Sequence, residues 1–518
     1  MLLIPLLSLS SFDSLFFVAF VFWRRIALTV VKVMERKVKY HKFRGTIGLK
    51  EIIDSFNDVI VYFDPDVDGM IAGYFVCKYL HMHGKRFQWF VNKDRLHDWS
   101  LDLSKCAGRD IIAVDFRIPS CIIKDVVQAG CNIVSMDHHV SGDAFISVKG
   151  ANGKRGVIIN NQYPFEEEDG RYLSGAGVVF ETLRLLDESF DTSENRALVG
   201  LTLLSDVCEI ENPLAAGYLY DLYNHKKEGY IGYLIDHTIG GKDYGFGSPR
   251  MDRSYVDFKF SPAINSNLRF GNENDVVMFF LGSGKLDLEC HSRQKELVKA
   301  IQRSVTVKEF SNLRVVFYKD WEVKSNESVD SLSGFVGLVA SRYLDGKKSV
   351  IAYVVSIKED GTKYVKRASF RGNLSTADYL TGIRKFVTAE GHPTAFGIKE
   401  MVPSRELFSS INDVCAGLDA TSAHSCSVRP VINMSVYSGS RGRETAEKNM
   451  YCLSRNRSYV RYIGKGISVK RSGENYTEYS VDGVSVMCFD NAVNFSNGLI
   501  FPILERGYVK YYLQLESL

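Results

Sequence analysis

Short apolar runs alternate with amphipathic stretches along the chain from about residue 50 to residue 140. The runs have the length of strands, as in DVIVYFD (58–64) and RDIIAVDF (109–116), and the stretches between them have the length of helices. This alternation predicts an α/β fold in which helices cover both faces of a parallel sheet. It returns after residue 309, and short strands rich in Tyr, Val and Ser follow residue 402.

The pattern predicts five segments along the chain. They are an apolar N-terminal segment (1–34), a parallel-sheet domain (35–287), a linker helix (288–308), a smaller α/β domain (309–402) and a mainly β C-terminal domain (403–518). A chain of 518 residues is long enough for two to four domains, which agrees with this division.

The first 23 residues are apolar except for Asp13, and Arg24 and Arg25 follow them. This length suits a membrane anchor or a signal anchor. Pro5 and a serine cluster weaken a membrane span, so the alternatives are a packed helix or a mis-assigned start, with translation beginning at Met34. If the segment is an anchor, we expect a membrane-anchored protein. If it is a packed helix or a mis-assigned start, we expect a cytoplasmic one.

Overall composition favours no particular partner. The 64 Lys and Arg residues nearly balance 61 acids, which gives a formal net charge of +3. The ten cysteines include no C-x-x-C pair, so the sequence suggests neither a zinc ribbon nor a disulfide scaffold. Reduced thiols in a cytosolic protein are the expected state.

Acidic and histidine side chains follow the predicted strands where each strand ends. Asp64, Asp66 and Asp68 follow the first strand, Asp115 closes the next, and the triplet 137–139 closes a third. Ligands of such sheets gather at the carboxyl ends of the strands. The triplet is Asp137, His138 and His139, and a further acid, Asp206, follows a helical run. Four separate segments are therefore expected to meet at one edge of the sheet.

Carboxylates this close repel one another, and divalent cations remove that repulsion. Oxygen ligands mixed with imidazole favour two Mn²⁺ ions, with Mg²⁺ as the alternative. Two such ions activate water and stabilise the oxygens of a phosphoryl displacement, so hydrolysis of a phosphate ester is the expected reaction. On its own, the D-x-D-x-D-G pattern also fits a calcium loop or a solvated turn.

These motifs resemble the DHH phosphoesterase superfamily, and within it the RecJ-like single-strand exonucleases. The matching motifs are DPDVDG (64–69), VDF (114–116), DHH (137–139) and LSDVCEI (204–210). SGFVGLVASRYL (333–344) resembles a signature of the DHH-associated domain, and EGHPTAFG (390–397) resembles its Gly-Gly-His loop. Glu390 stands where that loop has its first Gly, and Gly372 stands where the family often has Ser.

The resemblance implies a role for each matching residue. Asp66 and Asp115 would hold one metal ion, with Asp64 as a ligand or a nearby carboxylate. Asp68, Asp115, His138 and Asp206 would hold the other ion, which makes Asp115 a bridge. His139 would face the scissile phosphate, and Asp137 would orient the imidazoles.

Substrate binding is expected from the second lobe and from one loop of the first. Arg371 suits a terminal phosphate, and the backbone N–H groups around Gly391 and His392 suit another phosphate oxygen. Asn265 and Arg269, in a predicted loop, are candidates for contact with a nucleic-acid backbone. For Arg371 the alternative is a surface ion pair, and for the loop it is a purely structural role.

The C-terminal region adds a basic stretch. Between Arg441 and Arg471 nine Lys or Arg residues accompany two acids, and three tyrosines lie among them. Such a surface suits single-stranded nucleic acid, and RecJ-like proteins often carry an OB-type barrel in a region of this kind. A solvated β domain without this role is the alternative.

Three functions follow for testing. The first is a Mn²⁺-dependent single-stranded DNA exonuclease of DNA repair or recombination, for which the resemblance implies 5′-to-3′ polarity, release of mononucleotides, and a helicase or single-strand-binding protein as partner. RNA is the less favoured substrate. The second is a phosphodiesterase of cyclic dinucleotides or short oligonucleotides, although Tyr62 replaces the His often found in those enzymes. The third is a non-catalytic scaffold.

Overall fold

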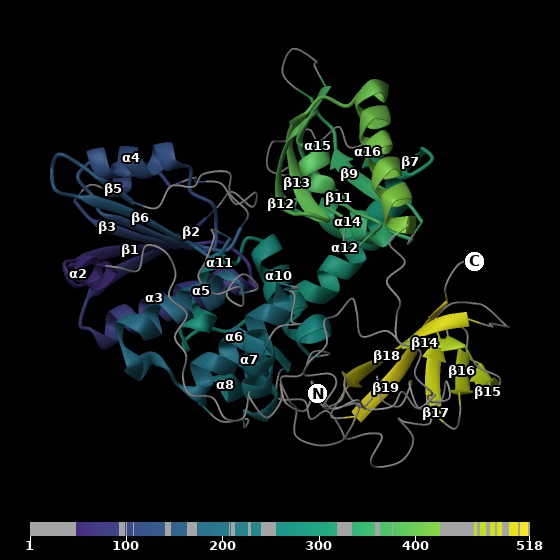
Figure 1. Cartoon of the computed structure of the whole chain (residues 1–518), viewed down its shortest axis with the longest axis horizontal. Coiled ribbons are helices and arrows are strands. Elements are labelled where there is room, and N and C mark those ends of the chain that lie inside the picture. Colours follow the sequence, from purple (N-terminus) through teal and green to yellow (C-terminus); the bar gives the residue numbers. More distant parts are fainter. Residues whose placement is uncertain are drawn as a thin grey trace, which may run out of the picture.

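The structure is a computed structural model of the whole chain. It describes the following residues: 48–92, 99, 101–106, 108–139, 147–162, 173–206, 208, 213–225, 229–239, 255–318, 334–345, 347–357, 363–374, 377–424, 460–463, 467–472, 477–481, 484–488, 497–505 and 508–515. Figure 1 shows three lobes, which follow one another along the chain.

The first lobe is built on a six-stranded sheet in the order β2-β1-β3-β4-β6-β5. Its strands are β1 (Asp58–Phe63), β2 (Arg86–Val91), β3 (Asp110–Val114), β4 (Ile133–Asp137), β5 (Ser147–Lys149) and β6 (Arg155–Asn160). All neighbours are parallel except the edge strand β5, which runs antiparallel to β6. The predicted parallel sheet is confirmed, with this one edge strand as an addition.

The sheet is buried on both faces because alternate residues of its strands enter different cores. In β1, Val61 packs in the core beneath α3 and α5, whereas Ile60 and Tyr62 pack in the core beneath α4. The helices of this lobe are α2 (Leu49–Asp54), α3 (Val67–Met82), α4 (Ser120–Gln128), α5 (Gly175–Leu186), α6 (Ser193–Ser205), α7 (Pro213–Asn224), α8 (Gly229–Ile239), α10 (Ser261–Arg269) and α11 (Glu273–Phe280). Helices on both faces leave the strand ends as the place for polar groups.

A helix, α12 (Cys290–Ser304), leads from the first lobe into the second. The second lobe has a sheet in the order β12-β13-β11-β9-β8-β7, with β8 and β9 parallel and the other neighbours antiparallel. Its elements are β7 (Val305–Glu309), β8 (Leu313–Tyr318), α14 (Val336–Tyr343), β9 (Ser349–Val354), β10 (Ser356–Ile357), β11 (Lys363–Arg371), α15 (Tyr379–Ile383), β12 (Thr388–His392), β13 (Ala395–Met401) and α16 (Arg405–His424).

The core of the second lobe continues past residue 402. Helix α16 contributes Phe408, Ile411 and Cys415 to the buried core that also contains Val315 of β8 and Phe370 of β11. Helix α16 therefore packs on the second sheet, and the β strands of the C-terminal region begin at residue 460 in the described part of the chain.

The C-terminal lobe is a six-stranded sheet in the order β14-β18-β19-β17-β16-β15. Its strands are β14 (Val460–Ile463), β15 (Ile467–Ser472), β16 (Thr477–Val481), β17 (Val484–Cys488), β18 (Asn497–Glu505) and β19 (Tyr508–Leu515). The predicted β character of this region is confirmed. The pairs described give an open strand order, and an OB-like barrel stays a prediction.

Among the residues that the structure describes, no helix is both long enough and apolar enough to cross a membrane. The apolar segment 1–34, on which the anchor hypothesis rests, lies outside the described residues.

Candidate metal centre

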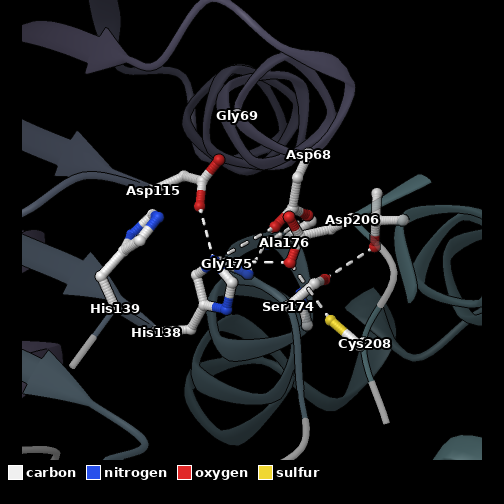
Figure 2. A network of polar contacts seen from close by, with 12 residues as sticks. Asp68, Gly69, Asp115, His138, His139, Ser174, Gly175, Ala176, Asp206 and Cys208 are labelled. Atoms are coloured by element: carbon white, nitrogen blue, oxygen red, sulfur yellow. Dashed lines mark hydrogen bonds and ion pairs between the residues drawn. The ribbon is translucent and has the colours of Figure 1, made fainter. Parts of the chain in front are cut away.

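The predicted acids and histidines meet where β1, β3 and β4 end. Asp64 directly follows β1, Asp115 directly follows β3, and Asp137 is the last residue of β4. Asp206 reaches the same place from the end of α6, where it is the residue that caps the helix. Figure 2 shows His138 between the carboxylates of Asp115, Asp68 and Asp206.

The first acidic motif begins helix α3. Asp66 has extended backbone angles and caps α3, because its Oδ1 accepts a hydrogen bond of 2.9 Å from the Gly69 N–H. Gly69 is required there, since a Cβ atom would lie 2.4 Å from the Asp64 carbonyl oxygen. The strand end and the helix start are thus packed backbone to backbone, which fixes where Asp64 and Asp68 lie.

Asp68 is buried and its carboxylate is held by the start of another helix. Its Oδ2 accepts a 2.7 Å hydrogen bond from the Gly175 N–H, and its Oδ1 accepts one of 3.0 Å from the Ala176 N–H. Both donors lie in the first turn of α5, where unpaired N–H groups and the helix dipole stabilise negative charge. The carboxylate of Asp68 therefore has a fixed orientation in the cluster that it forms with Asp115, His138 and Asp206.

Asp115 has a strained backbone and almost no space around its side chain. Its φ of 63° is the only positive value among the non-glycine residues that the structure describes. A Cβ atom on Gly175 would lie 2.3 Å from Asp115 Oδ1, so that helix must begin with glycine. Strain of this kind persists where surrounding contacts demand it, here at the residue that the family resemblance implies as a bridge between two ions.

His138 is the centre of the cluster. Its Nε2 lies 3.3 Å from Asp115 Oδ1, 3.7 Å from Asp206 Oδ2 and 3.9 Å from Asp68 Oδ2. Asp115 Oδ1 is buried and accepts no hydrogen bond from the described residues, which is costly for a carboxylate. An imidazole with three carboxylates within 4 Å of its Nε2 offers the oxygen and nitrogen ligands that Mn²⁺ or Mg²⁺ accepts. The residues present fit a divalent cation.

The neighbouring histidine has a different environment. His139 Nδ1 lies 2.8 Å from Asp137 Oδ1, and the His139 backbone N–H donates to the same oxygen at 3.2 Å. Asn160 holds the pair by donating from Nδ2 to Asp137 Oδ2 and to the His139 carbonyl oxygen. His139 also lines the cavity, with its Nδ1 engaged by Asp137.

Burial and mutual repulsion set the charges of the cluster. Burial, followed by the charge of Asp206, raises the pKa of Asp68 well above its ordinary value. Burial, followed by the charge of Asp68, does the same to the pKa of Asp115. At Asp137, burial acts in the raising direction, but the charge and hydrogen bonds of His139 outweigh it and lower the pKa. Burial and neighbouring acids thus disfavour the charged forms of Asp68 and Asp115, whereas His139 favours the charged form of Asp137.

The cluster opens into a cavity of about 330 Å³ between the first two lobes. The first lobe contributes Asp64, Asp66, Asp115, His138, His139 and Asp206 to its lining. The second contributes residues of α14, β11, β12 and β13, including Arg367, Arg371 and Gly391. The lining thus combines most of its acids from the first lobe with Arg367 and Arg371 of the second.

Arg371 reaches the cavity from the end of β11. Its guanidinium donates to Ser369 Oγ at 2.8 Å, to the Phe370 carbonyl oxygen at 2.7 Å and to Ser341 Oγ at 3.3 Å. Burial lowers its pKa to about 10, so it remains charged at neutral pH. In the part of the chain that the structure describes it has no carboxylate partner, which differs from the alternative of a surface ion pair.

The other expected substrate-binding residues are placed as follows. Asn265 and Arg269 line the cavity but lie in helix α10, so the prediction of a loop there is wrong. The sequence AINSNLR has no helix breaker after Pro262, which occupies the first turn, where proline is tolerated. Gly391 lines the cavity with a φ of 133°, and the side chain of His392 lies outside the described part.

An ion pair between Arg117 of the first lobe and Glu390 of the second joins the two lobes. Sequence analysis did not predict this pair. Arg117, two positions after Asp115, lies 3.3 Å from Glu390 Oε1, and Arg384 binds Glu390 Oε2 at 2.8 Å. Glu390 lines the cavity. Its replacement of the usual glycine was visible in the sequence, but the partner that explains it is 273 positions away.

Little of the predicted basic surface of the C-terminal lobe is described. Residues 441–459 lie outside the described residues. Lys470 and Arg471 are exposed and both pair with Glu478. Single-strand binding by this region stays a prediction.

Replacing Gly175 with alanine tests the packing of the cluster. The added methyl group would collide with Asp115 Oδ1, so we expect Gly175→Ala to weaken Mn²⁺ binding roughly 10- to 100-fold, as measured by titration calorimetry. Gly417→Ala in α16 is the control, because a Cβ atom there meets nothing within 4 Å. Equal affinities in the two variants, with normal circular dichroism, would contradict the described geometry.

Raised carboxylate pKa values predict that metal binding depends on pH. Without metal, Asp68 and Asp115 ionise less readily in the folded chain than in the unfolded chain, so their contribution to stability falls as pH rises above 3.8. A cation needs the ionised form and reverses this loss. We expect the increase in melting temperature caused by Mn²⁺ to be larger at about pH 8 than at about pH 5. Asp115→Asn should reduce this difference, and an increase that is the same at both pH values would count against the account.

Comparison with known proteins agrees with the fold. Residues 58–204 match the model of the DHH family, N-terminal domain. The fold is similar to RecJ from Thermus thermophilus in complex with Mn²⁺, at a TM-score of 0.62, with 15% identity over 93% of this chain and 72% of that one. The Mg²⁺ complex of RecJ from the same organism gives a TM-score of 0.58, with 15% identity over 93% and 71% of the two chains.

A further exonuclease RecJ structure, bound to manganese, has a TM-score of 0.50 and 16% identity, over 74% of this chain and 96% of that one. No curated protein matches the chain. The likeness to RecJ extends over most of the chain. The family match covers Asp68, Asp115 and His138 and ends before Asp206. Residues 58–204 therefore match the DHH family, N-terminal domain, and the fold of the chain is similar to that of RecJ.

Proposed function

We propose that the protein is a single-stranded DNA exonuclease that uses two Mn²⁺ ions and degrades its substrate from the 5′ end to mononucleotides. One observation carries the proposal: a single cavity is lined both by the acid and histidine cluster and, on its opposite wall, by arginines of the second lobe. A phosphodiester held across that cavity has its scissile phosphate at the cations and a neighbouring phosphate at Arg371.

Cations held by the cluster would supply Lewis-acid stabilisation of the phosphoryl oxygens and would activate water. The side chains of the protein supply the rest. His139, oriented by Asp137 and Asn160, offers Nε2 as a hydrogen-bond donor or proton donor to the reacting phosphate. Arg371, preset by Ser369 and Ser341, offers a charged fork to the next phosphate.

The ligands of the two ions are proposed as Asp64, Asp66 and Asp115 for one, and Asp68, Asp115, His138 and Asp206 for the other. Asn265, Arg269 and Gly391 are proposed to contact the substrate backbone, since all three line the same cavity. DNA repair or recombination is the proposed setting, with a helicase or single-strand-binding protein as the partner that provides single strands.

A phosphodiesterase of dinucleotides is the second candidate, because the volume of about 330 Å³ is at the small end for ligand sites. Tyr62, where those enzymes often have His, is buried in the core beneath α4 and donates to Asn92 Oδ1 at 2.8 Å. A residue in that environment contributes nothing to a dinucleotide pocket, which favours the first candidate.

Cleavage of end-labelled substrates tests the proposed function. With Mn²⁺, we expect a long single DNA strand to be shortened from its 5′ end, and RNA, duplex DNA and a cyclic dinucleotide to react more slowly. Asp115→Asn should lower cleavage by more than roughly 100-fold, because loss of a ligand costs at least as much as loss of a group that supports one. Filter binding should show that this variant still binds the single strand. Faster turnover of the dinucleotide than of the long strand would favour the second candidate.

Removal of the Arg371 fork tests the role of the second lobe. Loss of a charged hydrogen bond to phosphate costs about 1.5–3 kcal/mol, so Arg371→Ala should raise KM for single-stranded DNA by roughly 10- to 100-fold. Arg342→Ala removes an exposed arginine of α14 and serves as the control. If both variants have the KM of the unaltered protein, Arg371 is not the phosphate clamp.

A further inference from the structure

Cys208 lies within the cluster, yet the chemistry above gives it no role. It follows the end of α6 by three residues, and its backbone N–H donates to the Leu203 carbonyl oxygen at 3.0 Å, which fixes its position. Its Sγ lies 3.2 Å from Asp206 Oδ2 and donates to that oxygen. Figure 2 shows the thiol beside Asp206, on the side of the cluster away from Asp115.

Three different donor types meet at this point. One ligand atom each of His138, Asp206 and Cys208 can be chosen so that all lie within 4.8 Å of one another. His138 Nε2 is 3.7 Å from Asp206 Oδ2, and Cys208 Sγ is 3.2 Å from the same oxygen. Tetrahedral Zn²⁺, with bonds of about 2.0–2.3 Å, holds its donors roughly 3.3–3.8 Å apart. Two of the three donor pairs are therefore already close to these separations.

The donor set discriminates between cations. Mn²⁺ and Mg²⁺ prefer oxygen ligands and leave a thiol as a hydrogen-bond donor to Asp206. Zn²⁺ and Co²⁺ accept nitrogen, oxygen and sulfur, and binding to sulfur adds a ligand that the oxygen-preferring ions do not use. A thiophilic cation thus gains a contact at Cys208 while it occupies His138 and Asp206.

We propose that His138, Asp206 and Cys208 form a binding site for a thiophilic divalent cation such as Zn²⁺, and that this ion inhibits the enzyme by taking two ligands from the catalytic ions. On binding, the S–H bond of Cys208 breaks, its proton passes to solvent, and the sulfur donates an electron pair to the ion. The inhibition rests on the proposed nuclease function, whereas the binding does not.

Titration of the full chain with Co²⁺ tests the binding. Thiolate coordination gives a sulfur-to-cobalt charge-transfer absorption, which we expect in the unaltered protein and in Cys121→Ser, whose exposed thiol in α4 serves as the control. Cys208→Ser should lack the absorption and bind Zn²⁺ roughly tenfold more weakly, or worse, in calorimetry. An absorption that persists in Cys208→Ser, or that is absent from the unaltered protein, would overturn the proposal.

Alkylation followed by mass spectrometry gives a second, position-specific readout. Zn²⁺ should protect Cys208 from iodoacetamide and leave Cys121 reactive, whereas Mn²⁺ should protect neither. Inhibition is measured as the rate of single-strand cleavage with Mn²⁺ and added Zn²⁺, divided by the rate of the same variant with Mn²⁺ alone. This ratio should be higher in Cys208→Ser than in Cys121→Ser, because the serine variant lacks the thiol ligand. Protection of Cys208 in a chain that cleaves no single strand would support this site and refute the nuclease. Cleavage without protection would do the reverse.

Discussion

The repulsion among buried carboxylates around His138 is the constraint on which the rest of the structure depends. Asp68 and Asp115 are both almost fully buried, and Asp206 lies within 4 Å of the same imidazole nitrogen. Side chains in this arrangement are unfavourable unless something positive compensates them. The fold holds them there by N–H groups of α5, by a positive φ at Asp115 and by glycine at 175, where no other residue fits.

Much of the fold was predictable from the pattern of apolar runs, because strands buried on both faces are continuous apolar segments and helices between them are amphipathic. The convergence of the acids was predictable for the same reason, since parallel strands end at one edge. The helix around Asn265 was missed because its polar residues resemble a loop when no partner is known. Packing on α12, where Arg269 donates to Gln294, stabilises it.

The contacts between distant segments were not predictable. Gly175 and Asp115, or Arg117 and Glu390, are ordinary residues in their own segments, and only the folded chain brings them together. Cys208 is similar, because its proposed role as a metal ligand depends on His138 and Asp206 beside it. At each of these positions, a neighbour from another element of the fold explains why that residue type stands there.

The presence of cations inside the cluster is tested most directly by anomalous scattering from crystals grown with Mn²⁺. The account predicts anomalous density within bonding distance of Asp68, Asp115, His138 and Asp206, and its loss in crystals of Asp115→Asn. Crystals of active, unchelated protein without density at that point would contradict it.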